Sequence, residues 1–143
     1  MTRIYESRFE NLLALHINFP LKAIWALGNI SGDSADLRDI ALRHGALQPM
    51  LKIIDESYDN EKILKLATWA TSNISRGRPL PKGEYVIAAI PTLLNVLQSQ
   101  TDSEALRDAA WALSAISHCG GHSGIDLILT CPNALPAVVS LLS

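Results

Sequence analysis

Cysteine, aromatic residues and net charge are all scarce in this sequence. Its 143 residues include two cysteines, Cys119 and Cys131, and aromatic residues make up 6% of the chain. Two cysteines cannot build the disulfide framework of a small secreted domain, so we expect a reducing, intracellular compartment. The formal net charge of -2 shows no basic excess of the kind that indicates a nucleic-acid partner.

Long apolar runs are missing as well. The longest, from Tyr85 to Leu97, is too short to cross a bilayer and contains Pro91. The first residues, Met1 to Glu6, lack the apolar segment of a signal peptide. We therefore expect neither a membrane span nor a signal peptide. With 48% apolar and 18% charged residues, the composition is that of a folded domain.

One short motif, by contrast, occurs three times. It reads Trp-Ala-Leu-Gly-Asn at 25–29, Trp-Ala-Thr-Ser-Asn at 69–73 and Trp-Ala-Leu-Ser-Ala at 111–115. The offsets between the tryptophans are 44 and 42 residues. Armadillo and HEAT repeats, which place two or three helices in each unit, have this period. The spacing therefore predicts an all-α solenoid in which the three motifs lie side by side.

Helical periodicity extends over nearly the whole chain, and strand signals are almost absent. Pro20 is typical of a first helical turn, and Gly32 and Asp33 predict the end of that helix. Ser34 and Asp59 are candidate N-caps of the next helices. The expected helices cover residues 7–15, 20–31, 35–44, 47–56, 60–75, 84–88, 91–98, 102–118, 123–130 and 134–142.

These helices group into repeated units of a short helix, a second helix and a long helix. We expect two full units with a partial unit at each end, each burying its apolar face against its neighbours. Leu12, Leu13, Val138, Val139 and Leu141 would then lie at or near open ends, which favours a piece of a longer solenoid or end-to-end self-association. The expected divisions are 1–19 (second-helix remnant), 20–33 (third helix of the first repeat), 34–75 (full repeat), 76–83 (Pro/Gly-rich loop), 84–118 (full repeat) and 119–143 (partial repeat).

The repeated motif suits an extended, Lys/Arg-rich peptide. Trp and Asn four residues apart share one face of a helix. The methylenes of a basic side chain can pack between indole rings, while its cation gains ~0.5–2 kcal/mol per cation–π contact. Each Asn carboxamide can both donate to and accept from a peptide backbone. A spacing of about 8–10 Å between helices corresponds to two or three extended residues per repeat.

Other interpretations remain open at this point. The tryptophans could be structural elements of the repeat, which would make the chain a short scaffold for protein–protein assembly. His118, Cys119, His122 and Cys131 could be read as a metal site, but their spacing matches no zinc pattern. A Cys119–His122 nucleophile pair would lack an orienting acid. We expect no metal, no cofactor and no enzymatic activity.

The motifs resemble the armadillo core of the importin alpha (karyopherin alpha) family, around its third to sixth repeats. Residues 25–33 are similar to the third-repeat signature, and Trp69 to Asn73 with the Pro-rich segment to Pro81 are similar to the fourth. Residues 108–114 resemble the fifth, and residues 44–47 with Pro49 resemble the turn between the first two helices. The resemblance implies a right-handed superhelical armadillo-repeat solenoid covering about residues 20–143.

The resemblance also implies a nuclear import adaptor in the cytoplasm and nucleus that binds classical nuclear localisation signals. Its partners would be cargo proteins and, in the full family, importin beta. Tryptophans would clamp basic ligand residues, asparagines would hold the ligand backbone, Asp33 would receive the principal lysine, and Asp108 and Arg76 would lie on the same surface. The implied peptide-binding residues are Trp25, Asn29, Asp33, Trp69, Asn73, Arg76, Asp108 and Trp111.

The sequence departs from the family pattern in two respects. We expect that no basic importin-beta-binding segment precedes the repeats and that the first two repeats are absent. Ala115 stands where the fifth repeat carries a polar residue, and His118 stands where it carries an acid. We expect an incomplete major signal-binding site, with the minor site absent.

Overall fold

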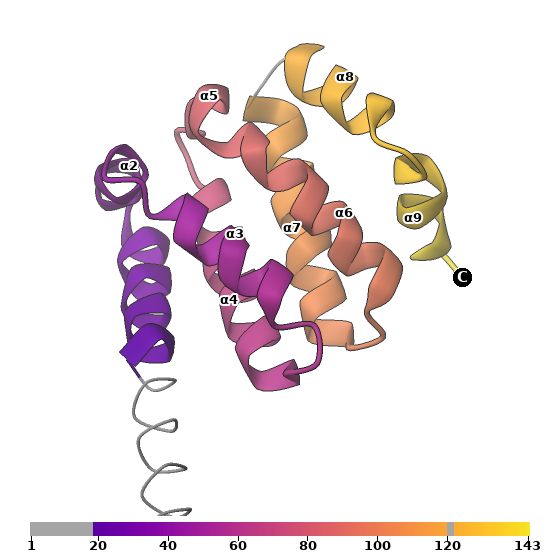
Figure 1. Ribbon diagram of the computed structural model, residues 1–143. Coiled ribbons are helices and arrows are strands. Elements are labelled where there is room, and N and C mark those ends of the chain that lie inside the picture. The colour runs from indigo at the N-terminus through magenta and orange to yellow at the C-terminus, as the bar shows by residue number, and fades with distance from the viewer. Residues whose placement is uncertain (1–18, 120–121) are drawn as a thin grey trace, which may run out of the picture.

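The computed structural model describes residues 19–119 and 122–143 (Figure 1), and within these ranges the chain is built of helices and contains no strand. The first described helix covers residues 19–33. The remaining elements are α2 (Ala35–Arg43), α3 (Leu47–Glu56), α4 (Glu61–Ser75), α5 (Gly83–Val86), the 3₁₀ turn η1 (Ile87–Ala89), α6 (Ile90–Ser99), α7 (Ser103–Cys119), α8 (His122–Thr130) and α9 (Ala134–Ser140).

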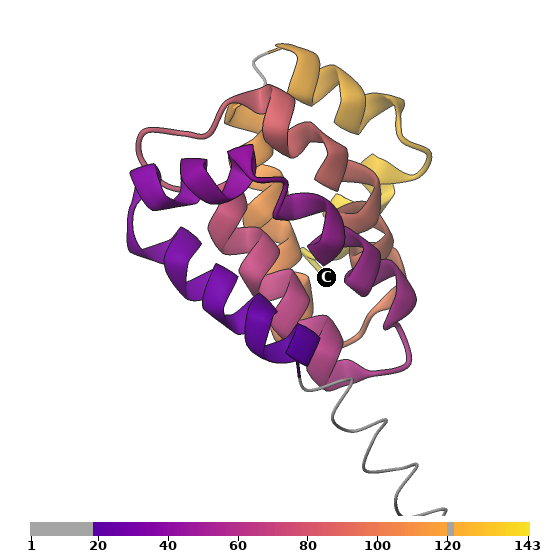
Figure 2. The same ribbon diagram turned by 60° about the vertical axis from the view of Figure 1, so that its left-hand side comes forward.

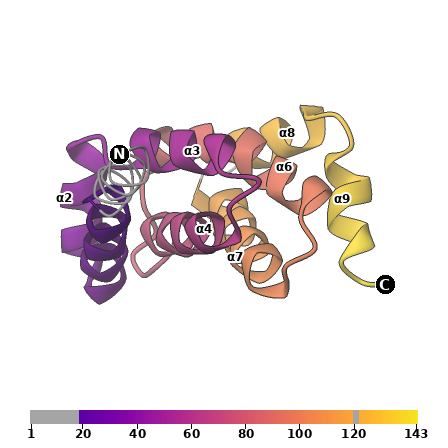
Figure 3. The ribbon, with the colours of Figure 1, turned by 60° about the horizontal axis from the view of Figure 1, so that its bottom comes forward.

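The helices stack as repeated units in two layers. Figure 3 shows α3 and α6 in one layer, with α4 and α7 in the other. Helix α4 packs chiefly against α7 and α3, and α7 packs against α6 and α8. The helix of residues 19–33 lies alongside α4 (Figure 2), and Asn73 of α4 donates a hydrogen bond to the carbonyl of Gly28 in that helix. The three tryptophan motifs therefore occupy neighbouring helices, as the repeat spacing predicts.

Local sequence signals explain most helix boundaries. Ser34 caps α2 by accepting a hydrogen bond from the backbone N–H of Leu37, as predicted. Pro91 lies in the first turn of α6, where a missing N–H costs nothing. The prediction that Asp59 caps α4 is wrong. Asn60 is the cap, and its Oδ1 accepts from the N–H of Ile63 at 3.3 Å.

The helix of residues 19–33 is longer than predicted, because Gly32 and Asp33 remain helical. Gly32 has a packing role there. A Cβ at this position would come within 3.0 Å of Nδ2 of Asn73, so glycine allows close approach of α4. The expected helix of residues 7–15, including Leu12 and Leu13, lies outside the described residues.

The core runs between the two layers. Leucine, isoleucine and methionine side chains of α3 and α6 meet small side chains of α4 and α7 there. Ala67 and Ala70 of α4 and Ala105, Ala109 and Ala112 of α7 are fully buried. Small side chains at a helix contact permit a short interaxial distance, so these alanines set the close packing of the long helices. That packing places their outer faces side by side.

The C-terminal end of the described stack exposes apolar side chains. Val139 is 59% exposed, and Val138, Leu135 and Leu141 are also exposed, as predicted for Val138, Val139 and Leu141. Within the described ranges, no single helix is long and apolar enough to cross a bilayer; α8 and α9 reach that composition only together, with a 92° bend between them.

Candidate functional site

The three tryptophans differ in how far they project from the surface. Trp25 is 59% exposed and Trp111 is 57% exposed. Trp69 is half-buried, and its indole packs so closely against the helix of residues 19–33 that a Cβ on Gly28 would overlap the ring. Two indoles are thus available to a ligand over most of a ring face, whereas the middle indole also holds two helices together.

The two repeated asparagines also differ. Asn29 is exposed, one turn from Trp25 and one turn from Asp33. Asn73 is only 7% exposed. Its Nδ2 donates to the carbonyl of Gly28 at 3.0 Å, and its Oδ1 accepts from the guanidinium of Arg76 at 2.7 Å. Asn29 can therefore reach a ligand directly, whereas Asn73 fixes α4 against the neighbouring helix and orients Arg76.

Asp33 lines a hollow of about 360 Å³ at the end of its helix. We name this the Asp33 hollow. Asn73, Arg76 and Arg78 form its other side, and Ser31 contributes a buried hydroxyl that has no hydrogen-bond partner in the described structure. Such a buried hydroxyl remains able to bond to a ligand. The hollow therefore offers both acceptors and donors to a polar group.

A second hollow, of about 460 Å³, lies between α4 and α7 beside Trp69. We name it the Trp69 hollow. Asp108 lies there, almost buried, and its Oδ1 accepts from Nε of Arg107 at 3.2 Å. The lining residues are Lys62, Lys65, Leu66, Trp69, Glu104, Arg107 and Asp108. This hollow contains both acids and bases, so its charges are partly compensated before any ligand arrives.

Lys65 joins α4 to the start of α7. Its ammonium lies 2.9 Å from Oε1 of Glu61, 2.9 Å from Oδ2 of Asp102 and 3.6 Å from Oε2 of Glu104. Hydrogen bonds that Lys65 donates to Glu61 and Asp102 raise the pKa of Lys65 above its ordinary value. The pKa of Asp102 is lowered, first by the N–H of Ala105 and then by Lys65. Lys65 is therefore a cation held in place by its neighbours.

A third hollow, of about 380 Å³, lies on the other side of the loop that follows α4. We name it the Trp111 hollow. Trp111, Leu80 and Ala115 form an apolar wall, and Arg76, Arg78 and His118 stand around it. The segment 76–78 borders both this hollow and the Asp33 hollow. The two hollows are therefore neighbours across one loop.

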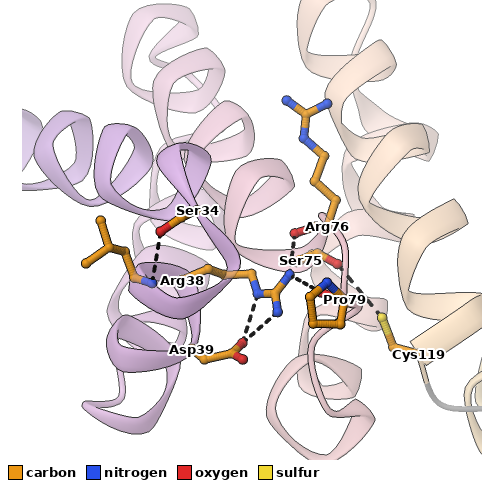
Figure 4. Close-up of polar contacts among 8 residues, drawn as sticks. Ser34, Arg38, Asp39, Ser75, Arg76, Pro79 and Cys119 are labelled. Atoms are coloured by element: carbon orange, nitrogen blue, oxygen red, sulfur yellow. Dashed lines mark hydrogen bonds and ion pairs between the residues drawn. The ribbon is translucent and has the colours of Figure 1, made fainter.

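Arg38 holds that loop in position (Figure 4). Its side chain is fully buried, and one guanidinium nitrogen donates to the carbonyls of Arg76 and Pro79 at 3.0 and 2.7 Å. The other two nitrogens donate to Oδ1 of Asp39 at 2.9 and 2.8 Å. A Cβ on Gly77, whose φ is +118°, would come within 2.9 Å of this guanidinium. Arg38 thus fixes the backbone from which Arg76 and Arg78 project.

Sequence reasoning did not identify Arg38 as part of this site. The available signal was its register, because Arg38 lies three and four residues before the buried Ala41 and Leu42. An arginine on the apolar side of a helix requires buried acceptors. Its position alone could not show that these acceptors are carbonyls of a loop about 40 residues further along the chain.

The cysteines and histidines that were considered as a metal site do not cluster. Within residues 19–119 and 122–143, no group of three or more His, Cys, Asp or Glu side chains could hold a metal ion. The thiol of Cys119 lies 3.0 Å from the carbonyl of Ala115, and burial raises its pKa. A raised pKa keeps a thiol protonated, which does not suit a nucleophile or a metal ligand.

Comparison with known proteins gives two findings. The family model of the armadillo/beta-catenin-like repeat matches residues 84–118. Importin subunit alpha-2 of Arabidopsis thaliana is 41% identical over 121 residues, which is 85% of this chain and 22% of that protein. Importin subunit alpha-1b of Oryza sativa subsp. japonica is 40% identical over 121 residues, again 85% of this chain and 22% of that protein. Importin subunit alpha-6 of Arabidopsis thaliana is 43% identical over 98 residues, 67% of this chain and 18% of that protein. The chain thus spans about a fifth of the length of these relatives.

Proposed function

Because the chain belongs to the importin alpha family of armadillo-repeat proteins, we propose that it is a peptide-binding module that recognises Lys/Arg-rich nuclear localisation signals. The proposal extends to a role in nuclear import, in the cytoplasm and nucleus, with cargo proteins and importin beta as partners. Names of the related proteins describe importin subunits rather than enzymes, which favours binding over catalysis.

The observation that carries the proposal is the exposed row of Trp25, Asn29 and Asp33 on one helix. The residues are four apart and all exposed, so an extended chain crossing the helix can touch all three side chains. An indole, a carboxamide and a carboxylate together match the aliphatic stem, the backbone and the cation of one lysine-containing segment. Each contact contributes a modest energy, since cation–π pairing gives ~0.5–2 kcal/mol.

The neighbouring helices contribute in different ways. Trp69, half-buried, offers its free edge beside Asp108, and Glu104 adds a second acid to the same hollow. Asn73 acts by orienting Arg76 and by holding α4 against the first helix. Trp111 presents an exposed indole to the same peptide at the far side of the loop. The peptide-binding surface in this proposal thus comprises all eight residues predicted from the sequence, with Asn73 in a supporting role.

Fluorescence anisotropy with a labelled Lys-Lys-Lys-Arg-Lys peptide tests the proposal. We expect saturable binding that weakens as salt rises, because exposed charges are screened over about 8–10 Å at physiological ionic strength. Trp25→Ala and Asp33→Asn should each weaken binding roughly two- to thirtyfold, the range of one partly exposed cation contact. Both side chains are exposed, so neither substitution should unfold the chain.

A matched control is Asp59→Asn, which removes an exposed carboxylate from the α3–α4 connection. Asp59 lines none of the Asp33, Trp69 and Trp111 hollows. Its removal changes the net charge as Asp33→Asn does, so general electrostatic attraction predicts equal losses. Equal losses in the two variants, or no saturable binding by the wild-type chain while circular dichroism shows it helical, would contradict the proposal.

A further inference from the structure

We propose that the Trp111 hollow is a separate subsite that takes an apolar side chain followed by an acidic residue from the same ligand. The inference rests on the proposed function, because it assigns a second part of the peptide bound at Trp25 and Asp33. It differs from that function in the chemistry of the residue bound. The family resemblance implies that Trp111 clamps a basic residue, whereas we expect it to contact an apolar side chain that is followed by an acidic residue.

The walls of the hollow favour an apolar side chain. Trp111 is 57% exposed and Leu80 is 44% exposed, and both face the same space of about 380 Å³. Ala115 leaves room between them, because its methyl group is the smallest side chain that a helix commonly carries. Covering two exposed apolar groups with a third removes area from water on both sides of the contact, which is favourable.

The charges around the hollow exclude a lysine. Arg76 and Arg78 line it, and no acidic side chain does so in the part of the chain that the structure describes. His118 stands at its rim, with Nδ1 2.8 Å from the carbonyl of Ser114. A ligand cation placed against Trp111 would meet two guanidinium groups and no compensating carboxylate. A ligand carboxylate in the same place would gain charge-assisted hydrogen bonds instead.

The other two hollows also contain basic side chains, but they differ from the Trp111 hollow because each contains at least one carboxylate. Asp33 projects into the first, and the Trp69 hollow contains Glu104 and Asp108. Acidic lining is therefore confined to the part of the surface near Trp25 and Trp69. The loop that separates this part of the surface from the Trp111 hollow is held by Arg38 at the carbonyls of Arg76 and Pro79. The arginines are therefore presented from a fixed backbone.

The surface is continuous between the Asp33 hollow and the Trp111 hollow, so one ligand can occupy both. Residues 76–78 border both the Asp33 hollow and the Trp111 hollow, so a single extended segment can pass from one to the other. Each residue advances such a segment by ~3.3 Å. The inferred ligand is thus a basic cluster joined directly to an apolar residue and an acidic residue.

The test compares extended versions of one labelled peptide by anisotropy. Leu-Glu is added to either end of Lys-Lys-Lys-Arg-Lys, and Ser-Gln extensions of the same length serve as the neutral reference. We expect one of the two Leu-Glu peptides to bind at least twofold and up to about tenfold more tightly than its Ser-Gln counterpart, the range of one exposed ion pair with an added apolar contact. Arg78→Glu should abolish this gain and transfer it to a Leu-Lys extension.

Two further variants separate the subsite from general effects. Lys82→Gln removes a positive charge from an exposed position in the same loop that lines neither hollow, and it should leave the gain intact. Ala115→Leu fills the Trp111 hollow without touching the Asp33 hollow. It should reduce the gain, measured against the affinity of the same variant for the Ser-Gln peptide.

The outcomes distinguish this inference from the function on which it rests. Absence of binding by the unextended basic peptide overturns the proposed function, and the inference with it. Tight binding of that peptide with no gain from Leu-Glu at either end overturns the inference alone. A gain that persists equally in Arg78→Glu would do the same, since it would place the acidic residue elsewhere.

Discussion

At the scale of single residues, Arg38 has the largest effect on the shape of the surface. Its guanidinium is fully buried and satisfies two loop carbonyls and one carboxylate. Partly buried backbone carbonyls that lose their donor carry part of the cost of desolvation. The loop has few other contacts to hold it, because residues 76–80 are all exposed. The positions of Arg76 and Arg78 therefore depend on a side chain that no ligand touches.

We predict that Arg38→Met lowers the free energy of unfolding by about 1.5–3 kcal/mol, the range for hydrogen bonds to a charged group. Arg38→Lys keeps the charge but not the planar fork, so it should lie between wild type and Arg38→Met. Urea unfolding at neutral pH measures both. The matched control is Arg43→Met, at the exposed end of the same helix, which should change stability by less than about 0.5 kcal/mol. Equal behaviour of the two methionine variants would contradict the assigned role.

Sequence reasoning at this scale identified the exposed row of the first helix but not the role of Asn73. Trp25, Asn29 and Asp33 follow from helical spacing alone, since residues four apart share a face. Asn29 and Asn73 occupy equivalent places in the repeat, yet one is exposed and the other is buried. The difference comes from the carbonyl of Gly28, 45 residues away, to which Asn73 donates, and from Arg76, one helical turn away, which donates to Asn73. Helical spacing brings Arg76 close to Asn73 but does not show that the carbonyl of Gly28 lies beside it.

At the scale of elements, the start of α7 is tied to α4 through one carboxylate. Asp102 accepts from the N–H groups of Glu104 and Ala105 and pairs with Lys65 of α4 at 2.9 Å. Both interactions need the ionised form, so the pKa of Asp102 is lower in the folded chain than in the unfolded chain. Its stabilising contribution is therefore present above the ordinary pKa of ~4 and is lost as pH falls through the lowered value.

We predict that Asp102→Asn destabilises the chain at pH 7 and that the difference from wild type shrinks as pH falls below about 4. Asparagine can still cap the helix, so this substitution isolates the ion pair, whereas Asp102→Ala removes the cap as well. Urea unfolding at pH 7 and pH 3 measures the difference. Asp126→Asn on α8 is the control and should show no such pH dependence. A difference that stays constant between the two pH values would disprove the coupling.

The order and type of the described helices were predictable, because the period of about 43 residues and the apolar spacing repeat along the chain. The exact boundaries of the helices were less predictable. Asp59 and Asn60 are both good N-caps, and only the geometry of the turn selects Asn60. Gly32 resembled a helix stop, but it remains helical, and its missing side chain leaves room for the approach of Asn73. Such choices depend on packing between repeats.

At the scale of the whole molecule, two kinds of surface remain for partners. One is the row of hollows that runs from Asp33 past Trp111. The other is the apolar end at α8 and α9, where Leu97, Leu113, Ile128 and Val138 are among the residues around a hollow of about 250 Å³. In the described units, α3 packs on α4 and α6 packs on α7, and α9 packs on α6 and α8. The alternative function, a scaffold that pairs end to end with a second copy, would use this surface.

The central claim is that the tryptophan motifs bind the basic peptide. The indole groups of these motifs can report such binding directly. The three tryptophans of the chain, one in each motif, give three indole N–H signals in a ¹⁵N–¹H spectrum. On titration with Lys-Lys-Lys-Arg-Lys, we predict that the signals of Trp25 and Trp69 shift until saturation, and that a peptide with alanine in place of the basic residues leaves them unmoved. Unmoved indole signals, with shifts confined to the amides of α8 and α9 as protein concentration rises, would contradict the claim and favour the end-to-end scaffold.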